Sequence, residues 1–186
     1  VRTKRPAAPD NFKGQELPVL KSEISLAPGD GEQNIFYPMG TNCELWSEFN
    51  PKFYRVQASL TGENFYSKAY GTFGMREFTA IGQHFFINGQ PTFLRGTVNC
   101  CEFPKTGYPD MTGKQWEKIF STTKAFGLNH MRFHTWCPPE IAFEMADRYG
   151  IYLEVELPDW CFKIGADTNV TEFFRAEGGR MIREYA

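Results

Sequence analysis

The sequence lacks the features that would indicate a metal, nucleic-acid or membrane protein. Its 20 Lys and Arg are balanced by 22 Asp and Glu, giving a net charge of −2, so neither nucleic acid nor an anionic membrane is expected as a main partner. No apolar run approaches the ~18 residues of a membrane span, and no signal peptide is visible. The five cysteines form no CxxC pair. We therefore expect no metal and no other cofactor.

What the sequence does have is apolar and aromatic content. Hydrophobic residues make up 41% of the 186 residues, and aromatic residues make up 16%. A chain of this composition buries a core and is not disordered throughout. Aromatic side chains are costly to leave exposed. A content this high therefore indicates a dense core, a stacking surface, or both.

The first half of the chain is typical of short strands. Residues 1–30 are rich in Pro, Lys, Asp and Gly and are interpreted as a linker or edge segment, with one possible strand at 20–26. Short β-prone runs separated by turn residues fill 31–80, which favours part of a β-sandwich. Asn88-Gly89 lies between two further β-prone runs and predicts a tight hairpin turn.

After Gly96 the hydrophobic period changes. Thr112 and Gln115 have the spacing of a capping box, and a later helix is expected to begin near Thr171 or Gly178. A β-α-β-α-β order predicts parallel strands joined by helical crossovers. The expected strands are 92–97, 128–133 and 151–156, and the expected helices are 112–126 and 139–149.

Polar and aromatic side chains follow each of these strands. Ligands gather at the carboxyl ends of parallel strands, and a mixture of carboxylates, a histidine and indole rings suits a carbohydrate. Other interpretations stay open: the histidine could be structural, the tryptophans could pack in the core, and Glu156 could cap a helix or pair with Arg132. The candidate substrate-binding residues are Glu102, His134, Trp136, Glu156 and Trp160.

Six ordered motifs between residues 45 and 153 make the pattern specific. Together they resemble signatures of glycoside hydrolase family 2, the family of β-galactosidases and β-glucuronidases. The motifs are LWSEFNPKFY at 45–54, FGMR at 73–76, FINGQP at 86–91, LRG at 94–96, GLNHMRFH at 127–134 and ADRYGIYL at 146–153.

The resemblance implies an incomplete immunoglobulin-like β-sandwich, whose early strands would precede residue 30, followed by part of a (β/α)8 TIM barrel. It assigns 31–80 to the sandwich and 81–186 to the N-terminal part of the barrel. It also implies retaining hydrolysis of a terminal non-reducing β-linked sugar, β-galactosidase-like, by the complete enzyme. Both catalytic carboxylates of such an enzyme are expected beyond Ala186, so the segment alone is expected to lack them.

Some family contacts carry over to this sequence. His134 matches a sugar-binding histidine, Glu156 matches the acid that ends the third barrel strand, and Glu102 falls where relatives have a polar sugar contact. Relatives often have GVNRHE where this chain has GTVNCC at 96–101, so the sugar and its linkage are left open. The resemblance implies that the remainder of the barrel or an oligomer partner completes the fold, and it weakly favours a periplasmic or secreted location.

Two other functions fit parts of the pattern. A noncatalytic carbohydrate-binding module would also use aromatic platforms. A small doubly wound domain could use the neighbouring Cys100 and Cys101 for redox chemistry, but no Gly-rich phosphate loop follows any expected strand. Measurements of sugar binding and of glycoside hydrolysis therefore distinguish the glycosidase, the binding module and the redox domain.

Overall fold

The computed structural model describes residues 16–25, 28–29, 31–158 and 165–185. Its described residues form two compact units, one containing 53–73 with the part before residue 45, the other containing 45–52 with the part from residue 74 onward. The strands are β1 (Tyr54–Gly62), β2 (Phe65–Phe73), β3 (Phe78–Ile81), β4 (His84–Ile87), β5 (Gln90–Thr92), β6 (Gly96–Asn99), β7 (His130–Phe133) and β8 (Tyr152–Val155). The helices are α1 (Lys114–Ala125), α2 (Glu140–Tyr149) and α3 (Thr168–Tyr185).

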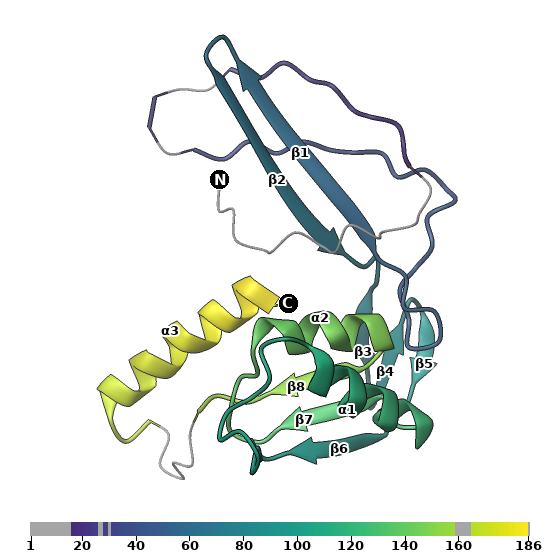
Figure 1. The fold of residues 1–186 in the computed structure, drawn as a ribbon, viewed down its shortest axis with the longest axis vertical. Helices are drawn as coiled ribbons and strands as arrows, with labels where there is room; N and C mark the ends of the chain where they lie inside the picture. The colour runs from purple at the N-terminus through teal and green to yellow at the C-terminus, as the bar shows by residue number, and fades with distance from the viewer. Residues whose placement is uncertain (1–15, 26–27, 30, 159–164, 186) are drawn as a thin grey trace. The chain divides into compact units, whose positions relative to one another are not determined.

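The first unit is built around the antiparallel hairpin of β1 and β2 (Figure 1). Its register runs from Tyr54 opposite Phe73 to Gly62 opposite Phe65, and the rings of Tyr54 and Phe73 stack with centroids 5.6 Å apart. The described residues 20–25 form no regular strand, so the strand expected there is not found. A two-stranded hairpin is marginal by itself, and the sandwich stays a prediction.

The second unit contains the predicted tight hairpin. Strands β4 and β5 are antiparallel, and β3 pairs with the other edge of β4. Between β4 and β5, Asn88 and Gly89 have φ values of 51° and 74°, the left-handed conformations that such a turn requires. The Asn88 side chain also donates from Nδ2 to the carbonyl of Trp46 at 3.0 Å. The prediction of the turn is confirmed.

The alternating pattern after Gly96 forms a three-stranded parallel sheet. Its order is β6-β7-β8, with Asn99, Phe133 and Val155 in register at the carboxyl ends. Helices α1 and α2 connect successive strands, as predicted. The first strand begins at Gly96 and not at 92, because 90–92 pair with β4 and because the backbone N–H of Arg95 donates to the Asn129 side chain at 2.7 Å.

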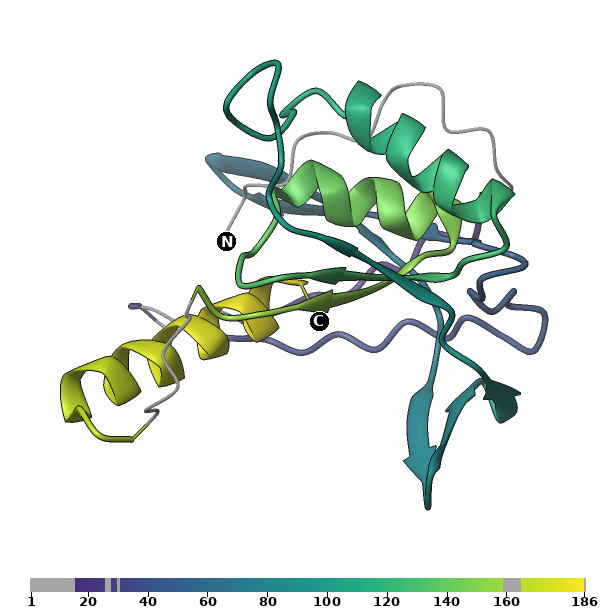
Figure 2. The same cartoon turned by 90° about the horizontal axis from the view of Figure 1, so that it is seen from below.

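Helices α1 and α2 lie on one face of this sheet (Figures 1 and 2). Side chains alternate between the faces of a strand, so Met131 and Phe133 point to the helices, whereas His130 and Arg132 lie on the opposite face. Phe133 is fully buried, and truncating such a residue to Ala costs about 3–5 kcal/mol. The buried core residues of this layer are Phe103, Trp116, Phe120, Met131, Phe133, Ala142, Ala146 and Ile151.

The start of α1 differs from the prediction. Gly113 precedes the helix and Thr112 makes no capping hydrogen bond, so the expected capping box is wrong. Asp110 has that role instead: one carboxylate oxygen accepts from the Gln115 N–H at 2.8 Å, and the other accepts from the Thr112 N–H at 2.8 Å. The carboxylate that caps α1 thus comes from the preceding loop and lies outside the capping-box spacing. It accepts from a backbone N–H that has no partner within the helix.

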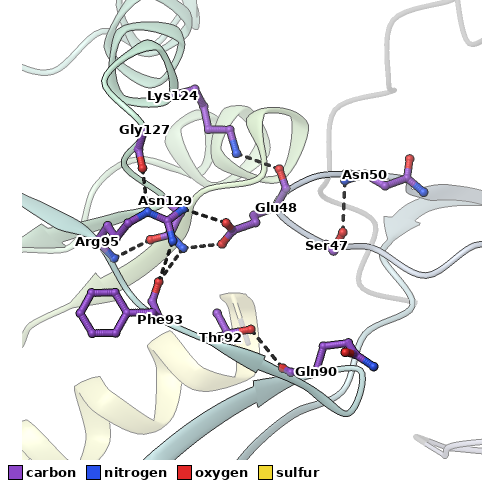
Figure 3. A network of polar contacts seen from close by, with 10 residues as sticks. All are labelled: Ser47, Glu48, Asn50, Gln90, Thr92, Phe93, Arg95, Lys124, Gly127 and Asn129. Carbon is purple, nitrogen blue, oxygen red and sulfur yellow. Dashed lines mark hydrogen bonds and ion pairs between the residues drawn. The ribbon is translucent and has the colours of Figure 1, made fainter.

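A buried polar network fixes the amino-terminal end of the parallel sheet (Figure 3). The Glu48 carboxylate is 5% exposed; it accepts from Arg95 Nη2 at 2.9 Å and from the Asn129 side chain. Lys124 Nζ donates to the Glu48 carbonyl at 2.7 Å. A Cβ on Gly150 would lie 2.6 Å from that carbonyl oxygen, so the end of α2 needs glycine there. The segment 45–52 is therefore hydrogen-bonded to the residues just before β6 and β7 and to α1, and it packs against the end of α2.

Among the described residues, no helix combines the length and the apolar character that crossing a bilayer would need.

Candidate functional site

Three side chains form a cluster at the carboxyl ends of the parallel strands. Arg132 lies in β7, His134 follows β7, and Glu156 follows β8. Arg132 Nε donates to Glu156 Oε1 at 2.5 Å. Arg132 Nη2 lies 3.1 Å from His134 Nδ1, and Glu156 Oε2 lies 3.3 Å from the same nitrogen. The side chains of Arg132, His134 and Glu156 are 42%, 28% and 24% exposed, so a ligand can reach the cluster.

Backbone geometry supports the carboxylate of this cluster. Thr135 has a φ of 57°, which is unusual for a β-branched residue. Its N–H donates to Glu156 Oε2 at 2.7 Å, and its hydroxyl donates to the His134 carbonyl at 2.9 Å. The Thr135 N–H, followed by Arg132, holds the pKa of Glu156 below its ordinary value of 4.5. Glu156 is therefore an ionised acceptor at neutral pH.

A second group of charges continues along the same face of the sheet. His130 Nε2 lies 3.4 Å from Glu154 Oε2, and Arg132 Nε lies 3.8 Å from Glu154 Oε1. Burial lowers the pKa of His130 below 6.5, and Glu154 counteracts this. A Cβ on Gly96 would lie 2.5 Å from His130 Nδ1, so glycine in β6 makes room for the imidazole.

The structure brings two of the predicted substrate-binding residues together, His134 and Glu156. Trp136 is partly buried and packs edge-on against Phe133 and Phe103, with centroids 5.2 and 5.8 Å apart. Glu102 is exposed, and among the described residues no hydrogen bond or ion pair joins it to the cluster. Trp160 lies outside the described residues. The binding roles of all five residues stay predictions.

The set of candidate site residues omitted Arg132 and Thr135. Arg132 has a signal in the sequence: 130 and 132 are spaced by two in one strand and 134 comes directly after its end, so their side chains are expected on one face. Arg132 therefore had to lie beside His134 on that face. Thr135 has no such signal, because its contribution comes from a backbone N–H and a positive φ.

Hydrogen bonding to a polyhydroxylated ligand is the chemistry that this cluster suits. Guanidinium and imidazole groups donate, a carboxylate accepts, and sugar hydroxyls do both. Within the described part of the chain, no three His, Cys, Asp or Glu side chains are arranged to hold a metal ion.

Comparisons with known proteins identify relatives of this chain. A β-galactosidase of Staphylococcus xylosus is 32% identical over 115 residues, which is 62% of this chain and 11% of that protein. Bacteroides uniformis β-glucuronidase 3 has a similar fold, with a TM-score of 0.64 and 24% identity over 76% of this chain and 18% of its own. A glycosyl hydrolase family 2 member from Bacteroides cellulosilyticus has a TM-score of 0.54 and 23% identity over 61% and 16%. No family model matches.

The chain thus spans less than a fifth of each of these relatives. All three relatives are glycoside hydrolases by name. The two solved structures are less than 25% identical to this chain and show a likeness of fold. The names of the sequence relative and the fold relatives agree with the family that the motifs resemble. The resemblance is therefore confirmed: this chain is similar to a segment of glycoside hydrolase family 2 enzymes.

Proposed function

We propose that this chain is part of a retaining glycoside hydrolase that removes a terminal non-reducing β-linked sugar, and that it supplies one wall of the sugar pocket. The wall would consist of His134 and Glu156, with Glu102, Trp136 and Trp160 contributing further contacts. The hydrogen-bonded cluster of Arg132, His134 and Glu156 is the observation that carries the proposal. It combines two donors with an ionised acceptor at the strand ends where parallel sheets bind ligands.

The same proposal gives the chain its place in the larger architecture. Residues 31–80 would be the end of an immunoglobulin-like sandwich, and 81–186 would be the first units of a (β/α)8 barrel. The three parallel strands with helices on one face support the barrel assignment, because barrel strands are parallel and carry their helices outside. The face with His130, Arg132 and Glu154 would then line the barrel interior.

Sugar binding by the chain tests the wall directly. We expect weak, saturable quenching of tryptophan fluorescence on titration with methyl β-galactoside or methyl β-glucuronide, because Trp136 donates to the Asn99 carbonyl beside the cluster. Glu156→Gln should shift the response to sugar concentrations at least about tenfold higher. Glu63→Gln, an exposed change in the β1–β2 turn, is the matched control and should leave it intact. Absence of binding to every sugar tested would contradict the proposal.

Hydrolysis separates the segment from the complete enzyme. The sequence contains no Asn-Glu dipeptide, the pair that in this family includes the acid/base residue. A glycosidase needs a proton donor and a nucleophile, so we expect no nitrophenol release from nitrophenyl β-glycosides above the buffer rate. Measurable release would show that the chain holds its own catalytic carboxylates. Tight sugar binding without hydrolysis would favour the noncatalytic module.

A further inference from the structure

Two groups compete for one nitrogen of His134. Arg132 Nη2 lies 3.1 Å from Nδ1, and Glu156 Oε2 lies 3.3 Å from it. A guanidinium has no acceptor and can only donate, whereas an ionised carboxylate can only accept. Nδ1 therefore accepts from Arg132 when it is unprotonated, or donates to Glu156 when it carries a proton. It cannot do both, and the choice fixes the tautomer of the neutral ring.

The contacts around Glu156 favour the first arrangement. Glu156 Oε2 already accepts from the Thr135 N–H at 2.7 Å, and Oε1 accepts from Arg132 Nε at 2.5 Å. The contact from Nδ1 to Oε2 is longer than an ordinary N–H···O bond of about 2.9–3.0 Å. Arg132 Nη2 carries two protons, so it can serve both Glu156 Oε1 and His134 Nδ1.

We propose that Arg132 is a positioning residue that donates to Nδ1 of His134 and so holds the neutral ring in its Nε2–H tautomer. Glu156 orients the guanidinium for this task through the Nε contact. In this arrangement the donor atom of the ring is Nε2, and Nδ1 is committed to the protein. Without Arg132, the nearby carboxylate would draw the proton to Nδ1.

The consequence for ligand binding rests on the proposed function. A ring fixed as an Nε2–H donor presents a hydrogen to an oxygen acceptor, such as a sugar hydroxyl. The opposite tautomer would present a lone pair at Nε2. Arg132 would thus select the direction of the hydrogen bond that His134 offers, without itself needing to touch the sugar.

The test reads the tautomer directly, with no sugar present. We would label the full chain with ¹⁵N-histidine and record long-range ¹H–¹⁵N spectra at about pH 8.5, well above the ordinary histidine pKa of ~6.5. Protonated and unprotonated ring nitrogens resonate far apart. The chain has three histidines, so His84→Gln and His130→Gln assign the signals. Wild type should show a protonated Nε2 and an unprotonated Nδ1 for His134; the reverse would overturn the proposal.

Variants separate positioning from mere packing. Arg132→Met keeps the length of the side chain and removes its donors, and should convert most of His134 to the Nδ1–H form. Arg132→Lys keeps a charged donor and should restore part of the Nε2–H population. An unchanged tautomer in Arg132→Met would overturn the proposal. If that variant does not fold, the wild-type and Arg132→Lys spectra still decide. Failure of the sugar titration would refute the proposed function and leave this result standing.

Discussion

The two ends of the parallel sheet each carry a glutamate paired with an arginine, and the two pairs differ in exposure. At the amino-terminal end, Glu48 is 5% exposed and bonds to Arg95 and Asn129. At the carboxyl end, Glu156 is 24% exposed and its partner Arg132 also reaches His134. The same two residue types form a closed structural contact at one end and an open, ligand-accessible cluster at the other.

The difference shows what burial decides. The Glu48 carboxylate accepts from Arg95 and Asn129, which come from two segments distant in sequence. Removing it takes one acceptor from each of these buried or half-buried donors. Glu156 is accessible to solvent, which screens its charge and can replace its partners. We therefore expect the amino-terminal pair to determine stability and the carboxyl-end pair to determine binding.

The largest effect is expected from Glu48→Ala. Breaking a buried ion pair costs about 3–5 kcal/mol, and because Arg95 is 40% exposed we expect about 3 kcal/mol. Urea unfolding followed by circular dichroism measures the change. Glu154→Ala, at a side chain that is 53% exposed, is the matched control and should shift stability by less than about 0.5 kcal/mol. Equal losses in both variants would remove the distinction between the two ends.

An intermediate effect is expected from Glu156→Gln. The amide keeps an acceptor for the Thr135 N–H but loses the charge that pairs with Arg132. We expect stability to fall by at most about 1 kcal/mol, while sugar affinity falls at least about tenfold, which corresponds to ~1.4 kcal/mol of binding. Urea unfolding and the fluorescence titration measure the two quantities on the same sample. A stability loss as large as that of Glu48→Ala would mean that both pairs are structural.

The smallest effect is a pH dependence from His130. Because burial lowers its pKa in the folded chain, the unfolded chain binds a proton first as the pH falls below 6.5. The folded state is therefore favoured above pH 6.5, and this contribution is lost as the pH falls toward the folded pKa. We expect wild type to lose more stability than His130→Asn between about pH 7.5 and 5.5, by less than about 1 kcal/mol.

Urea unfolding of both proteins at the two pH values checks this prediction. His130 faces the Glu154 carboxylate, which also lies near the Arg132 guanidinium. An identical pH dependence in wild type and His130→Asn would assign the acid sensitivity to other groups. Among these, the carboxyl groups of Glu156 and Asp110 also have lowered pKa values, and their contributions are lost at lower pH.

The sequence predicted turns and helix ends correctly where they depend on one or two adjacent residues. The Asn88-Gly89 turn and the helix that ends at Gly150 were predicted from adjacent residues, because positive φ is a property of single positions. The capping box failed because Asp110, outside the regular spacing, bonds to the N-terminus of α1. The first parallel strand was placed too early because a hairpin had already used residues 90–92.

The sequence by itself determined the order of strands and helices, and through its ordered motifs the resemblance to glycoside hydrolase family 2. These depend on spacing along the chain, which a sequence displays. Only the tertiary structure decided that Glu48 is enclosed while Glu156 stays open, and that Arg132 contacts both Glu156 and His134. Such contacts join residues up to 81 positions apart. Burial and partner geometry arise only when distant segments pack.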